Sequence, residues 1–179
     1  MTKPAVPLGR VILFWSIALG GAAFDLATKS AIFSMVGEPN TGPARTIIPD
    51  VLELRTSHNT GALWGFARGW AYASLTFAAL SVVAAIAIIY WLFYRGAASD
   101  ARLTAALGLI MAGALGNCYD RLAFGYVRDF VYFHVDAIRF ECAIFNFADN
   151  MLVAGALILM VLALKPERPA PSEQVVHAS

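Results

Sequence analysis

The feature that most constrains this chain is a run of 24 residues, 70–93, that contains no charged side chain. At about 1.5 Å per residue, a helix of that length crosses a hydrocarbon core of about 30 Å. Trp70 stands at its start and Trp91 and Tyr94 at its end, as aromatic residues often do where helices leave a bilayer. Composition agrees, because 59% of the residues are hydrophobic and only 14% are charged. The sequence therefore predicts an integral membrane protein.

Three further apolar segments are close to membrane length, at 11–33, 103–119 and 145–164. We therefore expect an all-α membrane protein with four transmembrane helices, in a single integral membrane domain over 1–165. A cleaved signal peptide is disfavoured for the first segment, because its apolar pattern continues through Ile32 and Phe33. The polar, proline-containing segment 166–179 is expected to be a disordered cytoplasmic tail.

With four spans, the two long polar connections, 36–68 and 121–144, lie on the same side of the membrane. Residues 51–56 of the first connection have a strand-like pattern. Basic residues close to the span ends, among them Arg10 and Arg95, lie on the opposite side, which the positive-inside rule assigns to the cytoplasm. Both termini are therefore predicted to be cytoplasmic, and both long connections extracytoplasmic.

Two carboxylates border the polar segment 125–149, which joins the third and fourth apolar segments. Asp149 follows Asn146 by three residues, and this spacing suits a helix N-cap and a first turn, where an acid is favourable in any case. Asp129 has no such explanation, because it lies in a strand-like Gly-x-Val-x-Asp-Phe stretch. Two acids at one membrane face indicate carboxylate chemistry there.

Two groups of polar residues within the apolar segments are spaced to share a helix face. Asp25 and Lys29 are four residues apart, so a structural ion pair is as good an interpretation as a direct role. We expect them to support the site or to face the substrate. Asn117, Asp120 and Arg121 fall at i, i+3 and i+4. A capped helix end explains them, but the arginine fork also suits a carboxylate, so we expect orienting roles.

Other catalytic chemistries have weaker support. The sequence contains no His-Glu-x-x-His zinc motif, no Gly-x-Ser-x-Gly elbow and no phosphate-binding glycine loop. A Cys–His pair, drawn from Cys118 or Cys142 with His58 or His134, is an alternative, although neither cysteine has an activating context nearby. Buried, inert thiols are the preferred interpretation.

The rival functional class is a small transporter or channel that uses Asp25, Asp129 and Asp149 as an ion path. That function favours acids spread through the membrane, whereas these lie towards one face. A structural scaffold subunit would leave the acid–amide cluster unexplained. The net charge of +1 gives no reason to expect a nucleic-acid partner.

Five short motifs together resemble the signal peptidase II family of bacterial lipoprotein signal peptidases. They are Asp25-x-x-Thr28-Lys29, Asn59-Thr60-Gly61-Ala62, Gly116-Asn117-x-x-Asp120-Arg121, Val127-x-Asp129-Phe130 and Phe145-Asn146-x-Ala148-Asp149. They occur in the family's order and run through almost the whole chain. Asn150 and Leu63-Trp64 stand where the family leads us to expect other residues.

The resemblance implies an aspartic endopeptidase of the bacterial inner membrane. It would cleave prolipoproteins on the N-terminal side of a diacylglyceryl-modified cysteine, with Asp129 and Asp149 as the catalytic dyad. The outer loops would form a small extracytoplasmic β-cradle beside the helices. The resemblance implies that the residues that bind the substrate or orient the dyad are Asn59, Gly61, Asn117, Asp120, Arg121 and Asn146. Asp25 and Lys29 would support these residues without contacting the reacting atoms. The expected partners are prolipoproteins and membrane lipids, and we expect a monomer with no metal or cofactor.

Overall fold

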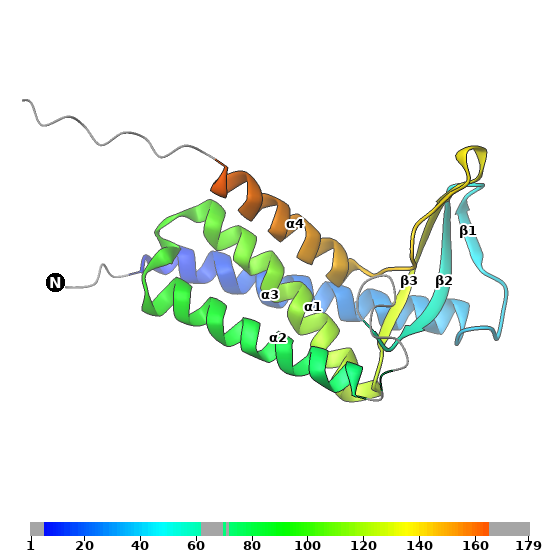
Figure 1. The fold of residues 1–179 in the computed structure, drawn as a ribbon, viewed down its shortest axis with the longest axis horizontal. Coiled ribbons are helices and arrows are strands. Elements are labelled where there is room, and N and C mark those ends of the chain that lie inside the picture. Colours follow the sequence, from blue (N-terminus) through cyan, green and yellow to red (C-terminus); the bar gives the residue numbers. More distant parts are fainter. Residues whose placement is uncertain (1–5, 62–69, 71, 165–179) are drawn as a thin grey trace, which may run out of the picture.

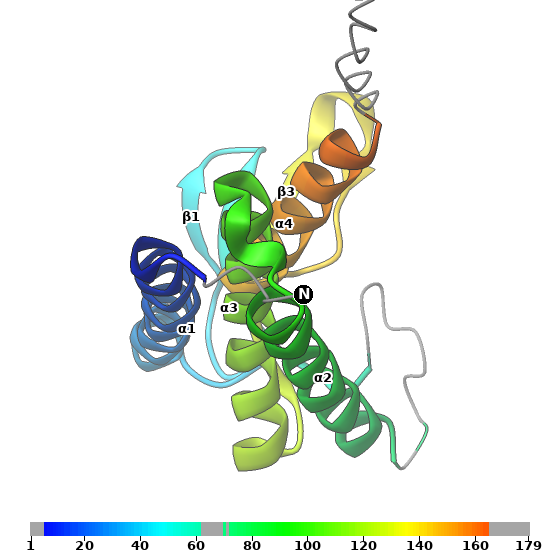
Figure 2. The same ribbon diagram turned by 90° about the vertical axis from the view of Figure 1, so that its left-hand side faces the viewer.

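The computed structural model describes residues 6–61, 70 and 72–164, and it consists of a helical bundle with a small sheet at one end (Figure 1). The α-helices in these ranges are α1 (Leu8–Val36), α2 (Ala73–Ile89), α3 (Ala101–Phe124) and α4 (Phe147–Ala163). A π-helical turn, Tyr90–Tyr94, extends α2. Helix α3 is central, because it packs against α1, α2 and α4 (Figure 2).

Glycines allow the neighbouring helices to approach α3 closely. A Cβ atom on Gly113 would collide with the backbone carbonyl of Ala148 in α4, and one on Gly155 with the carbonyl of Ala106 in α3. Small residues at such crossings are typical of helices that pack within membranes.

Among the described residues, three helices are long and apolar enough to cross a membrane: Leu8–Val36, Ala73–Tyr94 and Ala101–Phe124. Helix α4 is apolar but has 17 residues, just short of that length. The fourth span, expected over 145–164, therefore stays a prediction, and the expected tail, 166–179, lies outside the described residues.

Helix α3 continues past the predicted end of its span at Tyr119 and stops at Phe124. Gly125 ends it with a φ of 82°, a left-handed conformation that glycine adopts at little cost. Asp120 and Arg121 therefore lie within the helix, as their spacing from Asn117 predicted. The helix is thus longer than the apolar segment 103–119, and the end of the membrane span within it stays a prediction.

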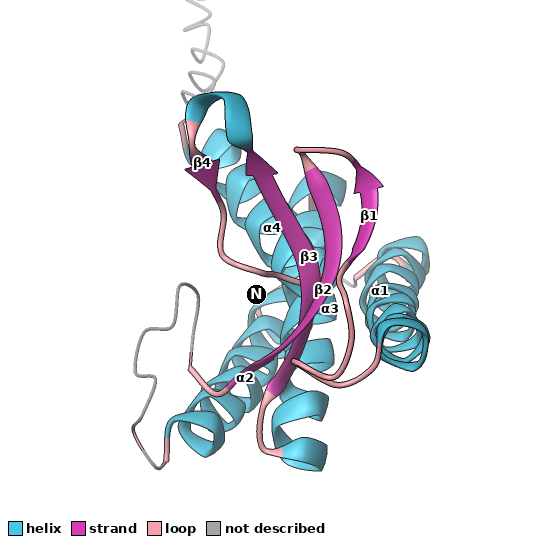
Figure 3. Ribbon diagram, turned by 90° about the vertical axis from the view of Figure 1, so that its right-hand side faces the viewer, coloured by secondary structure: helices cyan, strands magenta, loops and turns pink. Residues whose placement is uncertain are grey.

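The two polar connections form one antiparallel sheet in the order β1-β2-β3-β4 (Figure 3). Its strands are β1 (Arg45–Ile48), β2 (Leu52–Asn59), β3 (Val127–Val135) and β4 (Phe140–Glu141). The central pair comes from different connections, with Leu52 opposite Phe133 and Asn59 opposite Val127. A small sheet built from both connections agrees with the sequence prediction, although β2 runs on to Asn59 and β1 was not foreseen.

Candidate active site

The sheet meets the helices where β3 runs past the start of α4. The backbone N–H groups of Phe130 and Val131 both donate to the carbonyl oxygen of Phe145, at 3.0 and 2.8 Å. Phe145 directly precedes Asn146, the N-cap of α4. This backbone pairing therefore sets Asp129 on β3 beside the first turn of α4.

Asn146 and Asp149 cap α4 reciprocally. The Asn146 Oδ1 accepts from the Asp149 backbone N–H at 3.0 Å, and the Asp149 Oδ2 accepts from the Asn146 backbone N–H at 3.2 Å. This is a capping box, and the N-cap position predicted for Asn146 is confirmed. The amide nitrogen of Asn146 is not needed for the cap and is available to other acceptors.

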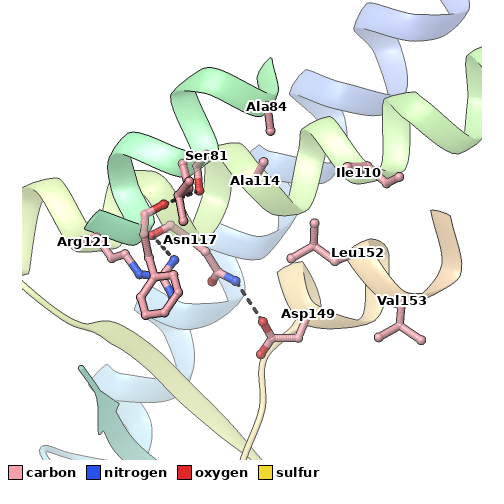
Figure 4. Close-up of a pocket in the computed structure, with 11 residues that line it drawn as sticks. Ser81, Ala84, Ile110, Ala114, Asn117, Arg121, Asp149, Leu152 and Val153 are labelled. Atoms are coloured by element: carbon pink, nitrogen blue, oxygen red, sulfur yellow. Dashed lines mark hydrogen bonds between the residues drawn. The ribbon is translucent and has the colours of Figure 1, made fainter. Parts of the chain in front are cut away.

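Side-chain amides connect the two aspartates. The Asn146 Nδ2 donates to the Asp129 Oδ1 at 2.6 Å and to the Asn117 Oδ1 at 3.2 Å. The Asn117 Nδ2 donates in turn to the Asp149 Oδ1 at 2.8 Å (Figure 4). Asn59, at the end of β2, donates to the Asp129 Oδ2 at 3.0 Å. Each carboxylate oxygen of the pair therefore accepts at least one hydrogen bond.

The two aspartates differ in environment. Asp129 is only 2% exposed, whereas Asp149 is half-buried. Burial, reinforced by the nearby Asp149, raises the pKa of Asp129 to about 7, although the hydrogen bonds from Asn146 and Asn59 oppose the shift. Asp129 can therefore hold a proton near neutral pH.

A buried charge cluster supports the amides. The Lys29 Nζ lies 2.7 Å from the Asp25 Oδ2 and 3.2 Å from the Asp120 Oδ2, and all three side chains are fully buried. Lys29 also donates to the Asn117 Oδ1 at 2.9 Å. Because Lys29 occupies the oxygen of the Asn117 amide, the nitrogen of that amide is turned towards Asp149.

Asp25 joins this cluster to α4. Its Oδ1 accepts from the backbone N–H of Ala148 at 2.8 Å, in the first turn of α4. A Cβ atom on Gly116 would collide with the Asp25 carboxylate, so glycine at this position of α3 makes room for it. The ion pair expected from the spacing of Asp25 and Lys29 is present, and it is one part of a larger network.

Arg121 lies at the mouth of a groove between α2, α3 and α4. Its Nη2 donates to the carbonyl oxygen of Gly61 at 3.2 Å and its Nη1 to that of Asn117 at 3.4 Å. The Nε is buried without a hydrogen-bond partner among the described residues. The groove has a volume of about 350 Å³. Its polar end holds Asn117, Arg121 and Asp149, and its apolar lining includes Ala84, Ile110 and Leu152 (Figure 4).

A second groove of about 350 Å³ lies on the other side of Asp149, between α4 and the strands β3 and β4. Its lining includes the aromatic rings of Phe133, Phe140 and Phe145, together with Cys142. Asp149 lines both grooves, so it is the member of the pair that is open to a ligand from either side.

The residues that the sequence singled out all belong to this connected network. They are Asp25, Lys29, Asn59, Gly61, Asn117, Asp120, Arg121, Asp129, Asn146 and Asp149. Sequence reasoning missed Arg128, which binds Asp120 and Ser30. No local pattern marks it, because its partners lie on other elements.

The Cys–His alternative has no support in the geometry. The Cys118 Sγ lies 3.7 Å from the carbonyl oxygen of Ala78, and His58 pairs with Glu38 at 2.9 Å. Within the described part of the chain, no hydrogen bond joins either cysteine to a histidine.

Comparisons with known proteins bear on the identity of this site. A family model described as signal peptidase (SPase) II matches residues 17–165. A lipoprotein signal peptidase of Rhodopirellula baltica is 40% identical over 168 residues, which cover 88% of this chain and 74% of that protein. A lipoprotein signal peptidase of Pseudomonas putida is 35% identical over 179 residues, which cover 99% of each chain.

Two solved structures share the fold of this chain. A bacterial membrane enzyme determined by the in meso method at 2.3 Å resolution matches with a TM-score of 0.72 and 27% identity, covering 96% of this chain and 99% of that chain. A second one, at 1.9 Å resolution, matches with a TM-score of 0.69 and 28% identity, covering 92% and 98%. From the family model and the sequence relatives, the chain belongs to the signal peptidase II family, the lipoprotein signal peptidases.

Proposed function

We propose that this protein is a membrane aspartic endopeptidase that removes the signal peptide from diacylglyceryl-modified prolipoproteins, with Asp129 and Asp149 as its catalytic carboxylates. Family membership supports a membrane protease that acts on lipoprotein signal peptides. The observation that carries the two-aspartate mechanism is the amide bridge, in which Asn117 and Asn146 bind both carboxylates and each other.

Two carboxylates can divide the work of peptide hydrolysis between a base and an acid. Two ionised carboxylates about 4 Å apart repel by roughly 4 kcal/mol at an effective dielectric constant of about 20. This repulsion corresponds to about three pK units, so such a pair holds one proton near neutral pH. The raised pKa of Asp129, about 7, supports Asp129 as the site of that proton.

In this mechanism the ionised Asp149 takes a proton from a water molecule, and the oxygen of that water molecule attacks the scissile carbonyl carbon. Asp129 gives its proton to the carbonyl oxygen, and a tetrahedral intermediate forms. When the intermediate collapses, the C–N bond breaks and Asp149 returns the proton to the leaving amine. Asp129 regains its proton as the new carboxyl group forms, so the pair ends the cycle in its starting state.

The groove beside Asp149 supports entry of the substrate from the membrane. Its walls come from α2, α3 and α4, and its lining is mainly apolar away from Asn117, Arg121 and Asp149. An apolar signal peptide could lie along these walls while its polar cleavage segment meets the carboxylates. Arg121, which has a buried Nε without a hydrogen-bond partner among the described residues, lies at the polar end of this groove and could bind a peptide carbonyl there.

The orientation that we propose follows from the basic residues at the span ends and from the parity of the spans, and the monomer is a further expectation. The active site faces the extracytoplasmic side, both termini are cytoplasmic, and the protein acts as a monomer. An ion-transport function is less well supported, because the buried acids gather where the sheet meets the helices rather than spreading along the bundle.

The direct test is cleavage by the purified protein. We expect it to release the signal peptide from a diacylglyceryl-modified precursor, with mass spectrometry placing the cut on the N-terminal side of the modified cysteine. The matched unlipidated precursor should not be cut. Equal cleavage of both precursors would contradict the lipid requirement, and no cleavage of either would contradict the proposed activity.

A further inference from the structure

Arg128 stands next to Asp129 on β3, and it is bound to α3. Its Nε and Nη2 donate to the Oδ1 of Asp120 at 3.1 and 2.8 Å, and its backbone N–H donates to the Oδ2 at 3.0 Å. Asp120 is fully buried, and the Arg128 side chain is 11% exposed. Charge-assisted hydrogen bonds of this kind are among the stronger ones in proteins, so this residue holds the start of β3 against α3.

The same side chain also reaches α1. The Arg128 Nη1 donates to the Ser30 Oγ at 3.3 Å, and the guanidinium carbon lies 6.0 Å from the ring centre of Phe33. On the α3 side it lies 4.6 Å from the ring centre of Phe124. Arg128 therefore ties the strand that carries Asp129 to two membrane helices at once.

Asp120 also connects Arg128 to Asp149, through Lys29 and Asn117. Its Oδ2 lies 3.2 Å from the Lys29 Nζ, and Lys29 binds the Asn117 amide that holds Asp149. The charges also balance, because Asp25 and Asp120 face Lys29 and Arg128. Without Arg128, two buried acids would share one lysine, and an uncompensated buried charge is costly.

We propose that Arg128 is a positioning residue for Asp129: through Asp120, it fixes the first residues of β3 so that Asp129 stays in register with Asp149. This inference rests on the proposed two-aspartate function. The groove between α2, α3 and α4, in which we place the signal peptide, has no residue of β3 among its lining residues. The second groove contains one residue of β3, Phe133, which is five positions along the strand from Arg128. Removal of Arg128 should therefore disturb the chemical step more than substrate binding.

The test compares Arg128→Gln and Arg128→Lys with Arg55→Gln. Arg55 is a matched control, because it lies on β2 of the same sheet, pairs with Glu53 at 2.9 Å and lies 4.2 Å from the ring centre of Tyr132, but is 48% exposed. Steady-state cleavage of a lipidated peptide gives kcat and KM, with kcat calculated per folded protein from thermal unfolding in the same detergent.

We expect Arg128→Gln to lower kcat roughly tenfold to a hundredfold with KM near the wild-type value, because small displacements of a reacting group are costly. Arg128→Lys should recover part of the loss, since lysine restores one donor to Asp120. Arg55→Gln should behave like the wild type. If Arg128→Gln does not accumulate as folded protein, Arg128→Lys carries the same comparison, with a kcat below that of the control.

Two outcomes would overturn the inference: a wild-type kcat in both Arg128 variants, or a rise in KM without a fall in kcat. Asp129→Asn, measured in the same assay, distinguishes a failure of the two-aspartate function from a failure of the Arg128 role alone. If that variant stays active, the two-aspartate function itself fails. If it is inactive while the Arg128 variants are normal, only the role of Arg128 is lost.

Discussion

The amide nitrogen of Asn146 lies 2.6 Å from the Oδ1 of Asp129, although Asn146 caps α4 and Asp129 belongs to β3. The cap of one helix is thus also a ligand of a buried carboxylate on another element. The oxygen of the same side chain caps the backbone of Asp149 at 3.0 Å. One residue therefore sets the position of both aspartates.

Asn146→Ser should separate the capping of α4 from the binding of Asp129. Serine caps helices about as well as asparagine, so the thermal midpoint should fall only slightly. Serine has no amide to reach Asp129 and Asn117, so we expect most of the turnover to be lost. Asn146→Ala is the matched comparison, because it also removes the cap, at a further cost of about 1 kcal/mol. Near-normal turnover of Asn146→Ser would argue against the amide bridge.

The raised pKa of Asp129, about 7, predicts how stability depends on pH. The folded state holds this proton more tightly than the unfolded state, whose aspartate titrates near 3.9. The stability that this group contributes is therefore fully present below about pH 4 and is lost as the pH rises towards 7. Asp129→Asn mimics the protonated form and should lack this loss. The thermal midpoint of Asp129→Asn, relative to that of the wild type, should therefore rise as the pH increases from 4 to 7.

The same proton predicts an alkaline limit on the rate. Turnover should fall as the pH rises above about 7, because Asp129 then loses the proton that it donates. The check is kcat/KM from pH 5 to 9 on a lipidated peptide, because this ratio reports the pKa values of the free enzyme. A rate that stayed level throughout the alkaline range would speak against Asp129 as the acid.

Much of the site could be predicted from the sequence because its signals are local. Asp25 and Lys29 share a face at i and i+4, and Asn146 and Asp149 have the spacing of a capping box. Asp129 was distinguished by its strand-like surroundings, and the family motifs added a role for Asn59, which donates to the Asp129 Oδ2 at 3.0 Å. Such residues can be identified without knowing how the elements pack.

The missed features depend on contacts between distant segments. Arg128 pairs with Asp120 of α3, and no sequence pattern on β3 indicates that partner. The partners of Asp120 on α1 and β3 could likewise not be read from the spacing on α3, which indicates only which residues share its face. The pairing of β2 with β3 joins two connections that are far apart in the sequence.

The predicted topology can be tested with single cysteines in a background in which Cys118 and Cys142 are replaced by alanine. Thr41 and Ser99 are exposed positions in connections on opposite sides of the proposed membrane domain. With extracytoplasmic outer loops, Thr41→Cys should react with an impermeant thiol reagent in intact cells, and Ser99→Cys only after lysis. The reverse pattern would overturn the orientation.

The central claim is that Asp129 and Asp149 act as a pair, and the most direct measurement is the cleavage rate of Asp129→Asn, Asp149→Asn and the double variant. Each single variant should lose nearly all turnover, and the double should be little worse, because residues that act as a unit are not additive. Folding should survive, since asparagine in the first turn of α4 costs only about 0.3–1 kcal/mol of dipole stabilisation. A well-folded single variant that cleaves a lipidated precursor at a near wild-type rate would contradict the two-aspartate mechanism.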